Sequence, residues 1–119
     1  MHRLIYSNKD NLSAGMIVAG WDPVEGPAIY SIPMGGTLMK VPFAMSGSGS
    51  WFIAGLLDAE YQESMTQEQA RALAKKSLSH AMARDGSSGG VVRTVVVTPE
   101  GNDTDYTPGN QLPFGPVGY

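Results

Sequence analysis

The 119-residue sequence contains no cysteine and only two histidines, and charged residues make up just 16% of it. Without cysteine the chain has no disulfide framework, no Cys-based zinc site and no cysteine nucleophile. The two histidines, His2 and His80, are isolated and provide neither a Ser-His-Asp order nor a metal-ligand spacing. We therefore expect neither a metal nor a cofactor.

Long apolar runs and a basic excess are also missing. The longest apolar run, around Met16–Trp21, is far too short to span a bilayer. The first residues lack the apolar core of a signal peptide. A net charge of -3 gives no basic footprint for nucleic acid. Apolar residues nevertheless make up 42% of the chain, enough for the core of one small domain. These features predict a soluble intracellular protein that binds neither nucleic acid nor membrane.

The first half of the chain has the pattern of short strands. Met16–Trp21 is a continuous apolar run, typical of a strand buried on both faces. A turn rich in proline and glycine separates it from Ala28–Ile32, so the two runs predict a hairpin. Further short strands are expected at Thr37–Val41 and Phe43–Met45. Residues 1–8 carry a weak helical signal.

Two helices follow in the pattern. Trp51–Tyr61 is apolar nearly all round and should be mostly buried. Thr66 and Gln69 form a capping-box pattern that begins a second helix, which should stop at Asp85-Gly86. The predicted buried stripe of this helix is Ala70, Leu73, Ala74, Leu78, Ala81 and Met82. The residues expected to face solvent are Arg71, Lys75, Lys76 and Ser79.

The end of the chain changes character. Val91–Val97 is the strongest strand signal in the sequence. Glu100–Asp103 is expected to form a turn, and the segment from Thr107 onward is rich in proline and glycine. We therefore predict one domain over residues 1–106 and an extended, mobile tail over residues 107–119.

Two clusters of glycine and serine carry the possible chemistry. Gly47-Ser48-Gly49-Ser50 enters a helix, where backbone N–H groups can bind an anion. The segment has neither a Gly-Lys-Ser/Thr ending nor a Gly-x-Gly-x-x-Gly with a downstream acid after a strand, so it matches no nucleotide-binding motif. The spacing alone favours a simpler role, in which Ser48 or Ser50 caps the helix. The second cluster, Asp85–Gly90, leaves a helix and is equally explained as its end and a flexible connection.

Several segments together resemble a known family, the eukaryotic proteasome beta subunits. The similarity is greatest to the caspase-like type, also called delta or Y, and it runs from about Asn8 to about Val97. The segments, in their order in the chain, are Ala19-Gly20-Trp21-Asp22, Tyr30-Ser31-Ile32-Pro33-Met34-Gly35-Gly36, Gly47-Ser48-Gly49-Ser50, Glu63-Ser64-Met65-Thr66 and Arg84-Asp85-Gly86-Ser87-Ser88-Gly89-Gly90.

The resemblance implies a fold and an activity. The fold is the α+β sandwich of N-terminal nucleophile hydrolases, with two sheets between outer layers of helices. The nucleophile of the family is the hydroxyl of an N-terminal threonine, and its own α-amine is the base. By this resemblance, Ser48 hydrogen-bonds around that amine, while Asp85 and Ser88 orient it and tune its proton affinity.

The same resemblance implies that this chain is the C-terminal part of a subunit and lacks the N-terminal threonine. The parent would be a threonine endopeptidase of the proteasome core particle, which cuts after acidic residues in ubiquitin-dependent degradation. Its partners would be neighbouring beta subunits, the alpha ring and unfolded polypeptide substrates, in cytoplasm and nucleus. The chain alone should be inactive. The alternatives are a non-catalytic assembly fragment of such a subunit, and an unrelated small anion-binding α/β module.

Overall fold

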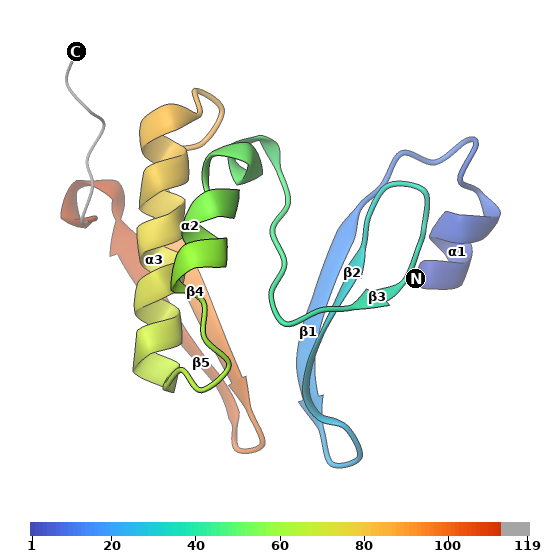
Figure 1. Cartoon of the computed structure of the whole chain (residues 1–119), viewed down its shortest axis with the longest axis horizontal. Helices are drawn as coiled ribbons and strands as arrows, with labels where there is room; N and C mark the ends of the chain where they lie inside the picture. The colour runs from blue at the N-terminus through green and yellow to red at the C-terminus, as the bar shows by residue number, and fades with distance from the viewer. Residues whose placement is uncertain (113–119) are drawn as a thin grey trace. The chain divides into compact units, whose positions relative to one another are not determined.

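The computed structural model describes residues 1–112 and combines helices with small antiparallel sheets (Figure 1). The contacts divide the chain into two compact units. The first comprises Met1–Ser46 and Val97–Gly101, and the second comprises Gly47–Val96 and the residues from Asn102 on. The mixture of helix and sheet confirms the predicted α+β class. The predicted boundary between residues 106 and 107 stays a prediction, since residues 113–119 lie outside the described part.

A hairpin forms the centre of the first unit. Strands β1 (Met16–Asp22) and β2 (Gly26–Ile32) pair antiparallel along their full lengths. The Asp22 carboxylate closes the turn by accepting the backbone N–H groups of Val24 and Glu25, both at 2.8 Å. Gly26 then continues with φ +73°, a conformation that side chains disfavour. The predicted hairpin is therefore confirmed, and its turn is built by one aspartate and one glycine.

The rest of this unit is small. Strand β3 is only Met39–Lys40 and pairs with β2, which gives the sheet order β1-β2-β3. The predicted strand at Phe43–Met45 is wrong, since these residues form an irregular connection. Helix α1 (His2–Ser7) confirms the helical signal at the start of the chain and buries Ile5.

Strand β1 is not buried on both faces, as its apolar sequence predicts. Ile17, Val18 and Trp21 remain 40%, 46% and 39% exposed. The reason is that the extensive contacts of β1 are with β2, which lies beside it in the plane of the sheet, so neither face of β1 has a layer of structure packed over it. A continuous apolar run indicates that a strand can be buried on both faces. Whether both faces are buried depends on the segments that pack against them.

The second unit is built around a long helix. The 3-10 helix η1 (Ser48–Phe52) leads into α2 (Ala54–Glu60), and α3 (Gln67–Arg84) follows. The predicted capping box begins α3: the Thr66 hydroxyl accepts the Gln69 N–H at 3.1 Å, and the Gln69 side chain accepts the Thr66 N–H at 3.0 Å. The single buried helix expected at Trp51–Tyr61 is wrong. The helix breaks at Ile53, and Trp51 is 87% exposed in the 3-10 turn.

Helix α3 is covered on two sides, which corrects the predicted solvent face. Arg71 pairs with Asp103 at 3.0 Å, and Lys75 forms an ion pair with Asp105; both aspartates lie on β5 (Gly101–Pro108). One turn further on, Ser79 is fully buried. The sequence pattern cannot show this, because the partners lie about thirty residues away. The side chains that α3 buries are Leu73, Ser77, Ser79 and Ala81, whereas Leu78 and Ala70 of the predicted stripe are exposed.

A second hairpin completes the description. Strand β4 (Val91–Thr98) confirms the strongest strand signal and forms a two-stranded sheet with β5. The turn is tighter than predicted, because β5 already begins at Gly101. The guanidinium of Arg93 lies over the Tyr106 ring at 5.9 Å. The predicted tail begins inside β5, and a 3-10 turn η2 (Gly109–Gln111) follows.

Candidate functional site

The candidate site begins at the turn that enters η1. Gly47 has φ +94° and ψ 170°, a backbone conformation that glycine tolerates best. Ser50 closes the turn, since both its N–H and its hydroxyl donate to the Gly47 carbonyl, at 3.1 and 2.7 Å. The hydroxyl of Ser48 is therefore the one serine group of this turn that points elsewhere.

The other half of the site is the end of α3. The Asp85 N–H still donates to the Ala81 carbonyl at 2.7 Å, but its φ of -98° and ψ of 117° leave the helix. The Asp85 carbonyl then accepts the Ser88 N–H at 3.1 Å. The helix thus ends where the sequence predicts, although by an extended aspartate, since Gly86 has no positive φ. This tight exit places Asp85 and Ser88 on the same side of the turn.

The three predicted site residues meet at one carboxylate oxygen. The hydroxyls of Ser48 and Ser88 each donate to Oδ2 of Asp85 at 2.6 Å. The backbone N–H of Ser87 donates to the other oxygen, Oδ1, at 3.3 Å. Ser48 lies 37 residues before Asp85 in the chain, so this contact joins two distant turns. We call Ser48, Asp85 and Ser88 the carboxylate cluster.

A glycine explains how closely the two turns approach. Gly49 is buried against α3, and a Cβ atom at this position would lie 2.9 Å from the Ala81 Cβ and 2.9 Å from the Ser88 Oγ. Real Cβ atoms essentially never approach neighbours this closely. The absence of a side chain at Gly49 therefore lets the Ser48 hydroxyl reach Asp85.

Hydrogen bonding keeps Asp85 ionised. The Ser48 hydroxyl, then the Ser88 hydroxyl, lower the pKa of the Asp85 carboxyl below its ordinary value, with a smaller contribution from the Ser87 N–H. Partial burial acts in the opposite direction and is outweighed. Donors that stabilise the charged form produce this direction of shift. The cluster is thus a negative charge with two polarised hydroxyls on it.

The alternative that Ser48 or Ser50 caps the helix is wrong. Gly47 occupies the N-cap position of η1, and no side chain makes a capping hydrogen bond there. The structure brings the predicted residues together, and their catalytic role stays a prediction.

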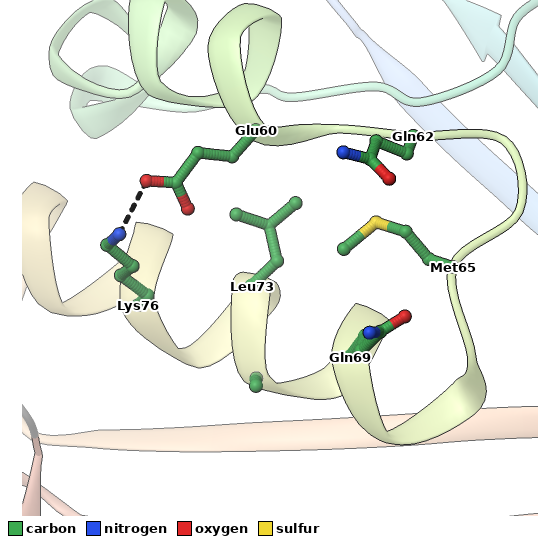
Figure 2. Close-up of a pocket in the computed structure, with 7 residues that line it drawn as sticks. Glu60, Gln62, Met65, Gln69, Leu73 and Lys76 are labelled. Atoms are coloured by element: carbon green, nitrogen blue, oxygen red, sulfur yellow. Dashed lines mark hydrogen bonds and ion pairs between the residues drawn. The ribbon is translucent and has the colours of Figure 1, made fainter.

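Sequence reasoning missed a pocket between helices α2 and α3. Figure 2 shows it between the end of α2, the connection that follows, and the first turns of α3. Its volume is about 310 Å³. A Glu60–Lys76 ion pair closes one end. The sixteen-residue separation of this pair follows no helical or strand period, so no local pattern reveals it. The pocket's lining is Glu60, Gln62, Met65, Gln69, Ala72, Leu73 and Lys76.

Two kinds of feature are absent from residues 1–112, the part of the chain that the structure describes. Across this part of the chain, no three His, Cys, Asp or Glu side chains gather closely enough to hold a metal ion. No helix there has the length and apolar character needed to cross a membrane.

Known proteins similar to this chain point to one family. The family described as Proteasome subunit matches residues 1–97. "Proteasome subunit beta type-6" of Arabidopsis thaliana is 50% identical over 109 residues, which cover 92% of this chain and 47% of the relative. "Proteasome subunit beta type-1" of Saccharomyces cerevisiae is 51% identical over 98 residues, or 82% of this chain and 46% of the relative. "Proteasome subunit beta type-9" of Homo sapiens is 43% identical over 113 residues, with 95% and 51% covered. The chain spans about half the length of the curated relatives it matches.

Proposed function

Because this chain belongs to the proteasome subunit family and matches its beta subunits, we propose that it is part of a threonine-type endopeptidase subunit of the proteasome core particle. We assign the parent to the caspase-like type, which cuts after acidic residues. One observation carries the assignment of roles: a single oxygen of Asp85 accepts hydrogen bonds from both Ser48 and Ser88, each at 2.6 Å.

The count of hydroxyl protons says what the cluster can bind. A serine hydroxyl has one proton to donate and two lone pairs that accept. The hydroxyls of Ser48 and Ser88 both donate their single proton in a hydrogen bond to Asp85. Toward any third group each oxygen is therefore an acceptor, polarised by the carboxylate behind it. A group with several N–H donors, such as an amine or ammonium, complements two neighbouring acceptors and a negative charge.

In the proposed mechanism that group is the α-amine of an N-terminal threonine. The neutral amine removes the proton of the threonine hydroxyl, which then attacks the scissile carbonyl. The lone pairs of Ser48 and Ser88 hold the amine in place. The ionised Asp85 lies one hydrogen bond further away and stabilises the ammonium that forms. Because the pKa of Asp85 is low, the carboxylate keeps its charge throughout this proton transfer.

We propose that the threonine lies upstream of Met1, as the resemblance to the family implies; the matched relatives are about twice as long as the aligned part, which leaves room for such a segment. The coding sequence upstream tests this directly. An in-frame Gly-Thr-Thr start supports the enzyme, whereas a reading frame without one favours a non-catalytic assembly fragment. The proposed partners are the neighbouring beta subunits, the alpha ring and unfolded polypeptides, in cytoplasm and nucleus.

Variants in assembled core particles test the roles of the cluster. Asp85→Asn keeps the size of the side chain but removes its charge, so we expect turnover of a peptide with an acidic residue before the cut to fall roughly ten- to a hundredfold. Ser88→Ala removes one neutral acceptor and should lower turnover roughly two- to tenfold. The lost hydrogen bonds should lower the melting temperature of the particles slightly in both, and not in proportion to the fall in turnover.

Ser50→Ala is the matched control, because this hydroxyl lies in the same turn but donates to the Gly47 carbonyl. It should leave turnover per assembled particle unchanged. If Asp85→Asn and Ser88→Ala instead lose melting temperature in step with turnover, the cluster only holds two turns together. The assignment of catalytic support is then wrong.

A further inference from the structure

The carboxylate cluster contains a dipeptide, Asp85-Gly86, whose peptide bond can rearrange through a cyclic imide. Asp85-Gly86 is the one place in the 119 residues where an aspartate or asparagine precedes glycine. Glycine has no Cβ to hinder its backbone nitrogen, which makes this pair prone to cyclisation. Gly86 is exposed, and a Cβ added to it would meet no atom within 4 Å. Apart from its chain neighbours, no atom therefore crowds the side of Gly86 on which a Cβ would stand.

We propose that Asp85-Gly86 is a latent isoaspartate site, and that the hydroxyls of Ser48 and Ser88 protect it while the cluster is formed. In the unprotected reaction the Gly86 nitrogen attacks Cγ of Asp85. The new N–Cγ bond replaces the Cγ–OH bond, and the amide proton leaves with that hydroxyl as water. Water then opens the five-membered succinimide at either carbonyl. Opening at the α-carbonyl gives an isoaspartate linkage, with no oxidant or other reactant consumed.

The geometry opposes each requirement of this cyclisation. Bonding of Cγ to the Gly86 nitrogen turns the carboxylate into an imide carbonyl, so the arrangement in which Oδ2 accepts two hydroxyls at 2.6 Å is lost. The Ser87 N–H at Oδ1 must also be released. Cyclisation needs the neutral carboxyl, because a carboxylate resists attack and its oxygen leaves poorly. The same hydroxyls keep the carboxyl ionised by lowering its pKa.

Isomerisation would also dismantle the cluster. The isoaspartate linkage inserts one extra carbon into the backbone and shortens the branch that carries the carboxylate. The two serine hydroxyls then no longer face the oxygen to which they donate. This inference depends on the geometry around Asp85 alone and does not rest on the proposed function. It holds or fails whether or not the cluster supports catalysis.

The test uses the purified 119-residue chain, incubated for days near neutral pH in native buffer or in concentrated guanidinium. Isoaspartate is measured by enzymatic methylation with protein-isoaspartyl methyltransferase, and mass spectrometry locates it. We expect formation at Asp85 to be at least about tenfold faster in the unfolded chain, since two hydrogen bonds to a charged group are lost. Gly86→Ala should abolish most of the signal under both conditions, which assigns it to this dipeptide.

Variants in native buffer identify the protecting groups. Ser48→Ala and Ser88→Ala should each accelerate isomerisation roughly three- to tenfold, the weight of one such hydrogen bond. Ser50→Ala, whose hydroxyl bonds only within its own turn, should match the parent chain. Ser48→Thr keeps a hydroxyl at an exposed position and should retain the protection.

Two results would overturn the proposal. Equal isomerisation of the parent chain in native buffer and in guanidinium means that the folded cluster protects nothing. Ser50→Ala accelerating as much as Ser48→Ala means that the turn, not the hydroxyl on Asp85, is responsible. If the alanine variants fail to fold, judged by circular dichroism, the comparison of native with unfolded parent chain and the Ser48→Thr variant still decide the question.

Discussion

Adding one methyl group at Gly49 should disrupt the packing between the η1 turn and helix α3. The added Cβ would lie 2.9 Å from the Ala81 Cβ, 2.9 Å from the Ser88 Oγ and 3.4 Å from Asp85 Oδ2. Ala81 has no side-chain rotation that relieves the contact, because its Cβ is fixed to the helix backbone. The turn or the helix must therefore move, and the Ser48 contact to Asp85 must lengthen.

The expected size of the Gly49→Ala effect follows from opposing terms. Overpacking a filled site costs about 1–3 kcal/mol. Burial of the new methyl stabilises the folded chain by about 0.8 kcal/mol. The lower conformational entropy of the unfolded chain adds a further stabilisation of about 0.4–1 kcal/mol. With the clash near the upper end of its range, because two contacts fall below 3.0 Å, the net loss of unfolding free energy should be about 1–2 kcal/mol.

Gly55→Ala is the matched control, because it makes the same chemical change inside α2. A Cβ there would meet no atom within 4 Å. Replacing a helical glycine by alanine should therefore stabilise the chain by roughly 0.5–1 kcal/mol. Urea unfolding followed by circular dichroism compares the two variants. We expect changes of opposite sign.

A second-site variant tests the cause. Ala81→Gly should itself cost about 1 kcal/mol as a helix substitution, but it removes the atom that the new methyl strikes. The loss of unfolding free energy in the double variant should then be smaller than the sum of the losses in the two single variants, by about 0.5 kcal/mol or more. If Gly49→Ala is as stable as Gly55→Ala, or the two changes at Gly49 and Ala81 simply add, the close approach of these two segments is not as described.

Three further outcomes are expected. Thr66→Ala removes the hydroxyl that accepts the Gln69 N–H and should cost about 1 kcal/mol in urea unfolding, whereas Thr66→Ser should cost little. The pKa of Asp85 is lowered in the folded chain, so its stabilisation should be present above pH 3.8 and vanish as pH falls through the lowered pKa, a dependence that Asp85→Asn abolishes. The pKa of Tyr30 is raised above 10.0, first by the hydrogen bond that its hydroxyl donates to Glu25. The stabilisation from this bond should be present below pH 10.0 and be lost as pH rises through the raised pKa. Ultraviolet titration should show that Tyr30 ionises at a lower pH in Glu25→Gln than in the parent chain.

Local signals in the sequence predict much of the secondary structure. The capping box at Thr66 and Gln69 fixes the start of α3 because its two hydrogen bonds lie within one turn. The turn between β1 and β2 is equally local, since Asp22 bonds to residues two and three positions further on. Features that need only neighbours in the chain can be predicted from the residues themselves.

Burial could not be predicted in the same way. Arg71 and Lys75 have the charge of a solvated helix face, yet their partners on β5 place that face against a strand. Trp51 has the bulk of a core residue and is almost fully exposed. In both cases the deciding contact, or its lack, involves segments far away in sequence. The spacing of apolar residues shows which face of a helix or strand can be buried, whereas its actual burial depends on which other segments pack against that face.

The carboxylate cluster falls between these two cases. A local rule explains each half, a helix start at Ser48 and a helix end at Asp85, and both rules favour capping. What joins the halves is a contact across 37 residues, which no spacing rule supplies. From the sequence, only the resemblance to a family links the two halves. Yet one residue carried a physical signal: Gly49 lies between two serines in a segment entering a helix, where glycine weakens the element unless something approaches closely. Here Ala81 and Ser88 approach, so the glycine that looks like a local defect marks the point where the two turns meet.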